Sequence, residues 1–408
     1  MICGLLGEKL GHSYSPQIHN CLGDYEYLIF EKSASELEDF LKSDCFHGLN
    51  VTIPYKKSVI PFCNELSPQA KALGAVNTIL RKPDGSLFGH NTDYFGFQWM
   101  TRRMNISYYG KKVLVLGSGG ASNTVCAVMR ELGANVIVIS RNGANNYDNL
   151  NLHTDCAVIV NATPVGMYPN TGISPIDLSL FPALEGVMDL IYNPARTQLL
   201  LDAELRGIQT ENGLSMLVAQ AKESAELFSG KTISNDVIFQ IHKQLQKKMK
   251  NIVLIGMPGC GKSTIGKILA QKLGRQYYDA DEEIQQFAGC SIPEIFQAKH
   301  EKGFREMETT VLQELGKRSG AVIATGGGCV TQTRNYPLLH QNGIIIWIQR
   351  EIADLPTDGR PLSQTIKLQD MYTIRKPMYE AFADFTVCNA DTPERTVAEI
   401  LKRMEMTE

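Results

Sequence analysis

The sequence has no excess of charge of either sign. Its 408 residues include 40 lysines and arginines and 43 aspartates and glutamates, which gives a formal net charge of -3. Proteins that bind nucleic acid or an anionic membrane surface do so mainly through an excess of basic residues. The composition therefore gives no reason to expect nucleic acid or a membrane as a partner, and it favours small molecules.

Long apolar runs and closely spaced cysteine pairs are missing as well. No apolar stretch reaches the length that spans a bilayer, and residues 1–7 form an apolar, strand-like stretch without a basic flank or a cleavage site. The ten cysteines include no Cys-x-x-Cys pair, so neither a zinc site nor a disulfide framework is indicated. We expect a cytoplasmic protein in a reducing compartment.

The length exceeds what one hydrophobic core usually supports, so two or three domains are expected. Two segments of the chain have the order strand, glycine turn, helix. In the first, a strand is predicted over 112–116, a glycine turn over 117–120 and, after a helical stretch, a second strand over 134–140. A second begins with the apolar strand 252–255 and continues into a helical pattern over 264–273. The polar segment between them, 229–250, predicts a helix leading into a linker, with a domain boundary near residue 248.

The second glycine turn, residues 256–263, reads Gly-Met-Pro-Gly-Cys-Gly-Lys-Ser. In such a P-loop the backbone N–H groups surround a phosphate, Lys262 reaches the β and γ oxygens, and the Ser263 hydroxyl suits Mg²⁺. A chance glycine-rich turn is the alternative, but the strand before it and the helix after it are what the motif requires. The segment therefore predicts a site for ATP or GTP.

Further polar residues follow the P-loop. Asp279 and Asp281 stand at the end of a predicted strand and point the same way, whereas the alternative is a solvated acidic turn. Arg305 and Glu308 share a helix face, a pair that is often only a surface salt bridge. Three glycines at 326–328 leave the backbone bare for a ligand. Arg360 and Arg375 supply cations for phosphoryl transfer, or are plain surface arginines.

Taken in this order, the motifs from about 250 to 405 resemble those of shikimate kinase. The resemblance implies that Ser263 and Asp279 serve Mg²⁺, that Asp281 is the candidate base, and that Arg360 is a lid arginine. It further implies ATP contacts from Gly259, Gly261, Lys262, Ser263, Thr264 and Arg360, and shikimate contacts from Asp281, Arg305, Gly326, Gly327, Gly328 and Arg375. The segment 351–359 departs from the family because it is short and acidic and lacks the extra arginine that commonly precedes Arg-Pro-Leu.

The first glycine turn, Gly-Ser-Gly-Gly-Ala-Ser, is a partial dinucleotide fingerprint, which a chance turn could also produce. About twenty residues on, where an NAD site places an acidic residue, the sequence has Arg141, which suits the 2′-phosphate of NADP. The loop 161–167 follows another apolar strand and either faces the cofactor or is an ordinary turn.

Outside that unit, Ser13 and Ser15 precede a predicted helix, where capping is the plain explanation. Lys56 lies just beyond a strand and Asp93 lies in a polar turn, and each alone could be a surface residue. Together with the segments 74–78 and 212–220, these residues resemble shikimate dehydrogenase across residues 1 to about 240. The resemblance implies substrate contacts from Ser13, Ser15, Thr52, Asn77 and Gln220, the catalytic pair Lys56 and Asp93, and NADP contacts from Gly117, Gly119, Gly120, Ala121, Arg141 and Thr163.

The two resemblances imply an α/β protein with a split substrate domain, a doubly wound, Rossmann-like NADP domain and a P-loop kinase domain with a parallel sheet. The expected boundaries are 1–97 completed by 213–240, then 98–212, a linker over 241–249, and 250–408. The expected function is reduction of 3-dehydroshikimate with NADPH, followed by phosphorylation of shikimate with ATP and Mg²⁺. The alternative is an NAD-dependent quinate/shikimate dehydrogenase fused to a regulatory P-loop module. The oligomeric state is not indicated.

Overall fold

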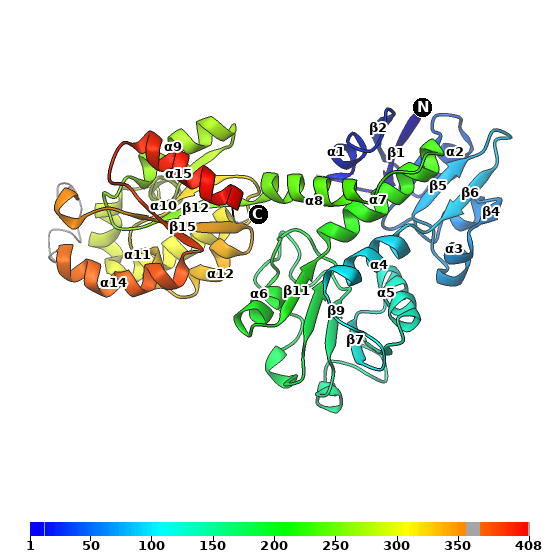
Figure 1. Ribbon diagram of the computed structural model, residues 1–408, viewed down its shortest axis with the longest axis horizontal. Helices are drawn as coiled ribbons and strands as arrows, with labels where there is room; N and C mark the ends of the chain where they lie inside the picture. Colours follow the sequence, from blue (N-terminus) through cyan, green and yellow to red (C-terminus); the bar gives the residue numbers. More distant parts are fainter. Residues whose placement is uncertain (12, 356–367, 407–408) are drawn as a thin grey trace. The chain divides into compact units, whose positions relative to one another are not determined.

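The computed structural model describes residues 1–11, 13–355 and 368–406 (Figure 1). The chain divides into two compact units. Unit 1 comprises Met1–Met167, Ile173–Tyr192 and Leu199–Gln244, and unit 2 comprises Tyr168–Gly172, Asn193–Gln198 and Leu245–Glu408. Among the helices in the described ranges, none is both long enough and apolar enough to cross a membrane.

The first sheet of unit 1 has six strands in the order β2-β1-β3-β5-β6-β4. The first three strands run parallel, while β5 pairs antiparallel with both β3 and β6. The apolar side chains of these strands and their covering helices form one buried cluster that includes Leu6, Leu49 and Ile79. The strands are β1 (Ile2–Gly7), β2 (Glu26–Glu31), β3 (Gly48–Val51), β4 (Glu65–Leu66), β5 (Thr78–Arg81) and β6 (Leu87–His90).

The second sheet of unit 1 has five parallel strands in the order β11-β10-β9-β7-β8. Parallel strands buried on both faces are near-continuous apolar runs, and β7 (Lys112–Leu116) is one such run. The chain leaves β7 to one side for β8 and returns to its other side for β9, so the glycine turn after β7 lies at the switch point of the sheet. The other strands are β8 (Asn135–Ile139), β9 (Val158–Asn161), β10 (Gly186–Asp189) and β11 (Gln209–Asn212).

Two helices of unit 1, α4 (Asp93–Arg103) and α7 (Leu214–Ser229), pack against each other (Figure 1). A side chain at Gly96 would lie 2.8 Å from the Met216 carbonyl oxygen, so this glycine permits the close approach of the two helices. The remaining helices are α1 (Ser15–His19), α2 (Leu37–Lys42), α3 (Pro68–Leu73), α5 (Gly120–Glu131), α6 (Gln198–Leu205) and the short 3-10 turns η1 (Ile60–Phe62), η2 (Leu150–His153) and η3 (Leu178–Leu180).

The helix α8 (Asp236–Met249) crosses the division between the two units. It includes all of the segment 241–249 that the sequence suggested as a linker, so this segment is helical. Its apolar side chains follow a helical repeat, and Ile238, Ile241 and Leu245 are buried.

Unit 2 is built on a five-stranded parallel sheet in the order β13-β14-β12-β15-β16. The P-loop follows the central strand β12 (Asn251–Ile255), and the helix α9 (Lys262–Leu273) follows the loop. The other strands are β13 (Tyr277–Asp279), β14 (Val322–Ala324), β15 (Gly343–Gln349) and β16 (Phe385–Cys388). The helices are α10 (Ala280–Ala288), α11 (Ile292–Gly316), α12 (Asn335–His340), α14 (Leu368–Phe382) and α15 (Pro393–Met406), with the turns η4 (Cys329–Thr331) and η5 (Ile352–Asp354).

The predicted α/β class with parallel sheets is confirmed. Two local predictions were wrong in detail. Asp93 is not in a turn but is the first residue of α4. Asp281 is not in the strand that ends at Asp279, because the Asp279 carboxylate accepts a hydrogen bond from the Asp281 N–H and starts α10 there.

Candidate active sites

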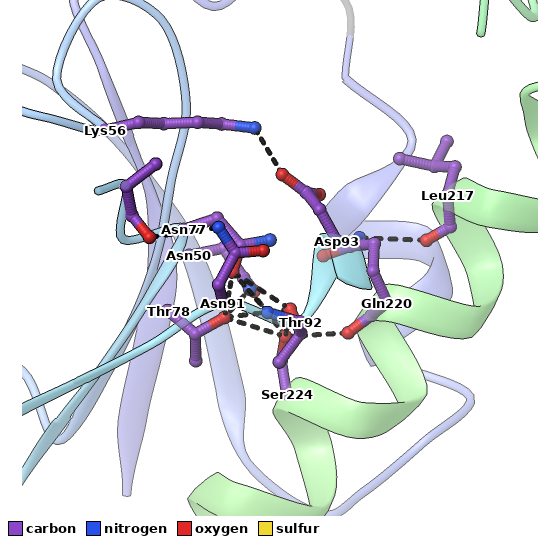
Figure 2. Close-up of polar contacts among 11 residues, drawn as sticks. Asn50, Lys56, Asn77, Thr78, Asn91, Thr92, Asp93, Leu217, Gln220 and Ser224 are labelled. Atoms are coloured by element: carbon purple, nitrogen blue, oxygen red, sulfur yellow. Dashed lines mark hydrogen bonds and ion pairs between the residues drawn. The ribbon is translucent and has the colours of Figure 1, made fainter. Parts of the chain in front are cut away.

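The site of unit 1 contains an ion pair between Lys56 and Asp93. The Lys56 Nζ donates to Asp93 Oδ2 at 2.6 Å, and the two side chains point toward one another from opposite sides (Figure 2). Lys56 follows β3 in a turn, and Asp93 opens α4. The side chains are 26% and 14% exposed, so both remain within reach of a ligand. The family resemblance implied these two residues as a catalytic pair, and the fold brings them into contact.

Asn77 and Gln220 come from other elements of unit 1. The Asn77 Oδ1 accepts from the backbone N–H of Thr92, the residue before Asp93, at 2.7 Å. Gln220 lies on α7, where its Nε2 donates to the Leu217 carbonyl at 2.8 Å (Figure 2). Both side chains are largely buried. The backbone contact therefore ties Asn77 to the start of the helix that carries Asp93.

Ser13, Ser15 and Thr52 follow the two parallel strands β1 and β3. The Ser13 Oγ accepts from the Ser15 N–H at 3.2 Å. The hydroxyl of Ser15 contacts Tyr27, whose own hydroxyl donates to Asn50 Oδ1 at 2.7 Å. Burial raises the pKa of Tyr27, so this phenol stays a hydrogen-bond donor. Tyr27 and Asn50 were not predicted, because a buried Tyr and Asn on strands carry no local signal of function.

The glycine turn after β7 meets the loop after β9. Gly117 has φ +102°, and a Cβ there would lie 2.9 Å from Thr163 Cγ2, so only glycine lets the two loops approach. At Gly119 and Gly120 a Cβ would meet no atom within 4 Å, which leaves open space beside the first turn of α5. Ala121 follows in the same turn of that helix. The open turn and the free N–H groups of the helix start fit a pyrophosphate group.

Arg141 is exposed and lies just beyond the end of β8. Burial raises the pKa of Tyr147, and the charge of Arg141 opposes that shift, which places the guanidinium near this ring. Thr163 donates its hydroxyl to Asn161 Oδ1 at 2.7 Å, and Asn161 in turn donates to the buried Asp189 at 3.1 Å. The loop 161–167 is therefore held by side chains of β9 and β10 and is not an unconstrained turn.

In unit 2 the lysine of the P-loop donates hydrogen bonds to backbone carbonyl oxygens of the same loop. The Lys262 Nζ donates to the carbonyl oxygens of Gly256 at 2.9 Å and Met257 at 3.1 Å. The Ser263 Oγ donates to Asp279 Oδ2 at 2.8 Å, and Tyr277 donates to the same oxygen at 2.9 Å. Proteins usually hold a nucleotide-bound Mg²⁺ through one or two of their own oxygen atoms, and this hydroxyl and carboxylate beside the phosphate loop are such atoms. These residues fit that ion.

A buried ion pair lines the same cavity as the P-loop. Arg305 Nη1 donates to Glu308 Oε2 at 2.7 Å, with exposed fractions of 6% and 0% for the two residues. The second oxygen of Glu308 and the Nε of Arg305 are buried without a hydrogen-bond partner in the described chain. Burial raises the pKa of Glu308 although Arg305 opposes the shift. The pair is thus not the surface salt bridge that its spacing alone allowed.

The triple glycine makes room for side chains of this site. A Cβ at Gly326 would lie 2.8 Å from oxygens of both Asp281 and Glu308, and one at Gly328 would lie within 2.5 Å of the Arg305 guanidinium. Gly327 accepts at its carbonyl from Arg375 Nη1 at 3.1 Å. The glycines therefore admit charged side chains to the strand end, where the sequence suggested only that they admit a ligand.

These residues surround one cavity of about 600 Å³. It brings together all the predicted unit 2 residues except Arg360, which lies outside the described residues. Glu308, Phe304 and Arg350 also line it and were not assigned a role from the sequence. The Arg-x-x-Glu spacing was a signal for Glu308, whereas Arg350, directly after β15, carried none. The predicted residues in the wall are Gly259, Gly261, Lys262, Ser263, Thr264, Asp279, Asp281, Arg305, Gly326, Gly327, Gly328 and Arg375.

Comparison with family models gives one match in each unit. The model of the shikimate dehydrogenase substrate binding domain matches residues 5–79. The shikimate kinase model matches residues 258–405.

Individual relatives match the first part of the chain. The chain is 35% identical over 266 residues to a shikimate dehydrogenase (NADP(+)) of Clostridium perfringens. The aligned part covers 60% of this chain and 97% of the relative. Among solved structures, it resembles a chorismate mutase/shikimate 5-dehydrogenase fusion protein from Clostridium acetobutylicum, with TM-score 0.58 and 37% identity over 60% of this chain and 97% of that one. It also resembles the Thermus thermophilus shikimate 5-dehydrogenase in complex with NADP(H) and shikimate, with TM-score 0.55 and 30% identity over 60% and 99%.

Proposed function

The chain belongs to the shikimate dehydrogenase family and also carries a shikimate kinase domain, and from this premise we propose that it is a bifunctional shikimate-pathway enzyme. One site reduces 3-dehydroshikimate to shikimate with NADPH, and the other phosphorylates the 3-hydroxyl of shikimate with ATP and Mg²⁺. The observation that carries the proposal is the cavity of unit 2, which joins a phosphate-binding loop to two arginines suited to an anionic acceptor. The acceptor that we propose is shikimate, because shikimate is the product of the reduction proposed for unit 1.

In the reduction, the side chains of unit 1 bind the substrate and supply a proton. Ser13 and Ser15 offer hydroxyls to the carboxylate, and Thr52, Asn77 and Gln220 contact the ring oxygens. Lys56 and Asp93, in contact at 2.6 Å, hydrogen-bond the ketone oxygen and deliver the proton that it needs once the carbon has received hydride. NADPH supplies that hydride when bound.

The cofactor site that we propose uses the turn after β7 and the loop after β9. Gly117, Gly119, Gly120 and Ala121 leave space and N–H groups for the pyrophosphate, and Thr163 borders the same turn. Arg141 binds the 2′-phosphate that distinguishes NADP from NAD. We assign residues 1–97 and 213–240 to substrate binding, 98–212 to the cofactor, 241–249 to the connecting helix and 250–408 to the kinase.

In the kinase site, Arg305 and Arg375 bind the shikimate carboxylate, and Asp281 accepts the proton of the attacking hydroxyl. Lys262, with Gly259, Gly261 and Thr264, holds the ATP phosphates, and we include Arg360 as the lid cation. Ser263 and Asp279 would hold Mg²⁺, which neutralises charge on the phosphates when bound. Gly326, Gly327 and Gly328 border the ring and make room for Asp281, Glu308 and Arg305.

The test is to incubate the full chain with 3-dehydroshikimate, NADPH and ATP·Mg²⁺ and to analyse the products. We expect shikimate 3-phosphate from the wild type, shikimate as the end product of Asp281→Asn, and unreacted 3-dehydroshikimate with Lys56→Met. Each variant should keep the activity of the other site, read for Lys56→Met by adding shikimate directly, and this controls for folding. If the wild type stops at shikimate, the kinase proposal is wrong and a regulatory P-loop module becomes the better description.

The preference for NADPH is tested separately, since it depends on Arg141. We expect the wild type to reduce 3-dehydroshikimate with a higher kcat/KM for NADPH than for NADH. An equal or higher value with NADH would instead favour the quinate/shikimate dehydrogenase alternative.

A further inference from the structure

A group of buried hydroxyls lies beneath the substrate residues of unit 1 (Figure 2). We call Thr78 on β5, Thr92 before α4 and Ser224 on α7 the hydroxyl cluster. Their oxygens lie 3.0 Å apart for Thr78 and Thr92, 3.1 Å for Thr92 and Ser224, and 3.3 Å for Thr78 and Ser224. None of the three residues is more than 1% exposed, so their hydroxyls are not placed to contact a ligand directly.

The Thr92 backbone N–H and two hydroxyls of the cluster determine which way the Asn77 amide faces. One amide atom of Asn77 lies 2.7 Å from the Thr92 N–H, 3.1 Å from the Thr78 hydroxyl and 3.2 Å from the Thr92 hydroxyl. A backbone N–H can only donate, so the atom that it faces must be the amide oxygen. The Asn77 nitrogen consequently faces away from the cluster. Within the described chain it has no hydrogen-bond partner, and it is not among the fully enclosed polar atoms.

Asn50 sets the direction of the hydrogen bonds within the cluster. Its own oxygen is occupied by the Tyr27 hydroxyl at 2.7 Å, so its Nδ2 must donate, to Ser224 at 2.7 Å and to Thr78 at 3.3 Å. The Ser224 proton goes to the Gln220 carbonyl at 2.8 Å. Thr78 accepts from Asn50 and is placed to donate its single proton to Asn77 Oδ1 at 3.1 Å, with the Thr92 hydroxyl at 3.0 Å as the other acceptor within reach. The order of donors thus runs from Tyr27 through Asn50 and Thr78 to Asn77.

We propose that Thr78 is a positioning residue for the reduction: its hydroxyl holds the Asn77 oxygen inward, so that the Asn77 nitrogen donates to a substrate oxygen. The inference rests on the proposed dehydrogenase function. It assigns Asn77 the role of donor only, so the ligand group opposite must accept a hydrogen bond, as a hydroxyl or carbonyl oxygen does. Without the Thr78 hydroxyl, the Asn77 oxygen keeps only its two contacts with Thr92, so the amide is held less firmly and presents its nitrogen to such a group less well.

The test is a double-mutant cycle on the full chain, with Thr78→Val, Asn77→Ala and the double variant. We expect Thr78→Val to lower kcat/KM for 3-dehydroshikimate roughly tenfold, the range for loss of a buried hydrogen bond, with KM for NADPH unchanged. In the Asn77→Ala background the same substitution should change kcat/KM less than about twofold, because its effect passes through Asn77. Equal losses in both backgrounds would refute the proposal.

Three controls separate positioning from a general loss of stability. Thr78→Ser keeps the hydroxyl and should restore most of the activity, whereas a loss as large as that of Thr78→Val would show that only the methyl matters. Thr101→Val removes another buried hydroxyl of unit 1, which donates to the Gln98 carbonyl at 2.8 Å, and should leave the rate unchanged. The kinase rate of the same chain normalises the amount of intact protein.

If Thr78→Val does not fold, Thr78→Ala replaces it in the same cycle, with a similar expected loss that also disappears with Asn77→Ala. An undiminished loss there overturns the proposal equally. Failure of the underlying function has a different signature, because the wild type would then not reduce 3-dehydroshikimate at all.

Discussion

The buried pair of Arg305 and Glu308 allows a quantitative prediction about why it is present. Glu308 is fully buried and Arg305 is 6% exposed. Burial raises the pKa of Glu308 in spite of the arginine 2.7 Å away, whereas Glu308 and Glu301 raise the pKa of Arg305 in spite of its burial, so the carboxylate is the charge that burial disfavours. The pair is therefore expected to serve substrate binding at a cost in stability, and substitutions should separate the two effects.

Glu308→Leu should strongly destabilise unit 2. Removal of one partner of a buried pair typically costs about 3–5 kcal/mol, because the other charge stays buried. Glu301, at 3.3 Å and with its side chain 54% exposed, remains as a second partner of Arg305, so we expect the lower end, about 3 kcal/mol. For a domain of this size, each kcal/mol shifts the melting temperature by about 2–4 °C, which gives a decrease of roughly 6–12 °C.

The decisive variant is the double substitution Arg305→Met with Glu308→Leu. It removes both charges and should recover most of the lost stability, while kinase activity stays absent in the single and the double variant. Because the kinase is inactive in both variants, calorimetry follows the unfolding of unit 2. Thermal inactivation of the dehydrogenase on the same chain is the control and should not change. If the double variant is as unstable as Glu308→Leu, the buried arginine charge is not the cause.

Three further predictions concern unit 1. Lys56→Met should lower the dehydrogenase kcat by roughly 10²–10⁴-fold with the kinase rate unchanged, and a loss below tenfold would contradict its role in proton delivery. Arg141→Ala should raise KM for NADPH about tenfold and leave KM for NADH nearly constant, as loss of a charge-assisted contact requires. Burial lowers the pKa of His19 from 6.5 to about 3, so the unfolded chain binds a proton that the folded one refuses. Stability that is present above pH 6.5 should then fall by about 1.4 kcal/mol per pH unit as the pH drops toward 3. In urea inactivation of the dehydrogenase, His19→Phe should flatten this slope, whereas an unchanged slope would exclude His19 as its source.

The parts of the fold that follow from local patterns were predictable. The strand predicted from the apolar run 112–116 begins and ends at the same residues as β7. The P-loop lies between β12 and α9, as its motif requires. Both signals depend only on neighbours in the chain, namely apolar runs and glycines. The reactive role of Lys56 and Asp93 comes from the family resemblance and stays a prediction. Their 2.6 Å contact has no local signal, because it joins the turn after β3 to α4.

What the sequence could not show depends on long-range packing. Thr78, Thr92 and Ser224 are ordinary residue types on three separate elements, and only the pairing of β5 with its neighbours and the packing of α4 on α7 bring their hydroxyls together. The spacing of Arg305 and Glu308 is the same for a surface pair and a buried one. Only the glycines at 326–328, which leave room for these side chains, distinguish the two cases.

The two proposed sites differ in the number of cationic side chains that face shikimate. The reason is that the two reactions change the charge of the substrate differently. Reduction of a ketone adds hydride and a proton and leaves the charge of the substrate unchanged, so the proposed contacts from the hydroxyls and amides of Ser13, Asn77 and Gln220 are expected to suffice beside one lysine. Phosphoryl transfer adds a dianionic group to an acceptor that is already a carboxylate, and cations must offset that charge as it develops. The cavity of unit 2 accordingly gathers Lys262, Arg305, Arg350 and Arg375 in its wall. Glu308 holds Arg305 in this wall, and Asp279 holds the Ser263 hydroxyl, the other proposed Mg²⁺ ligand.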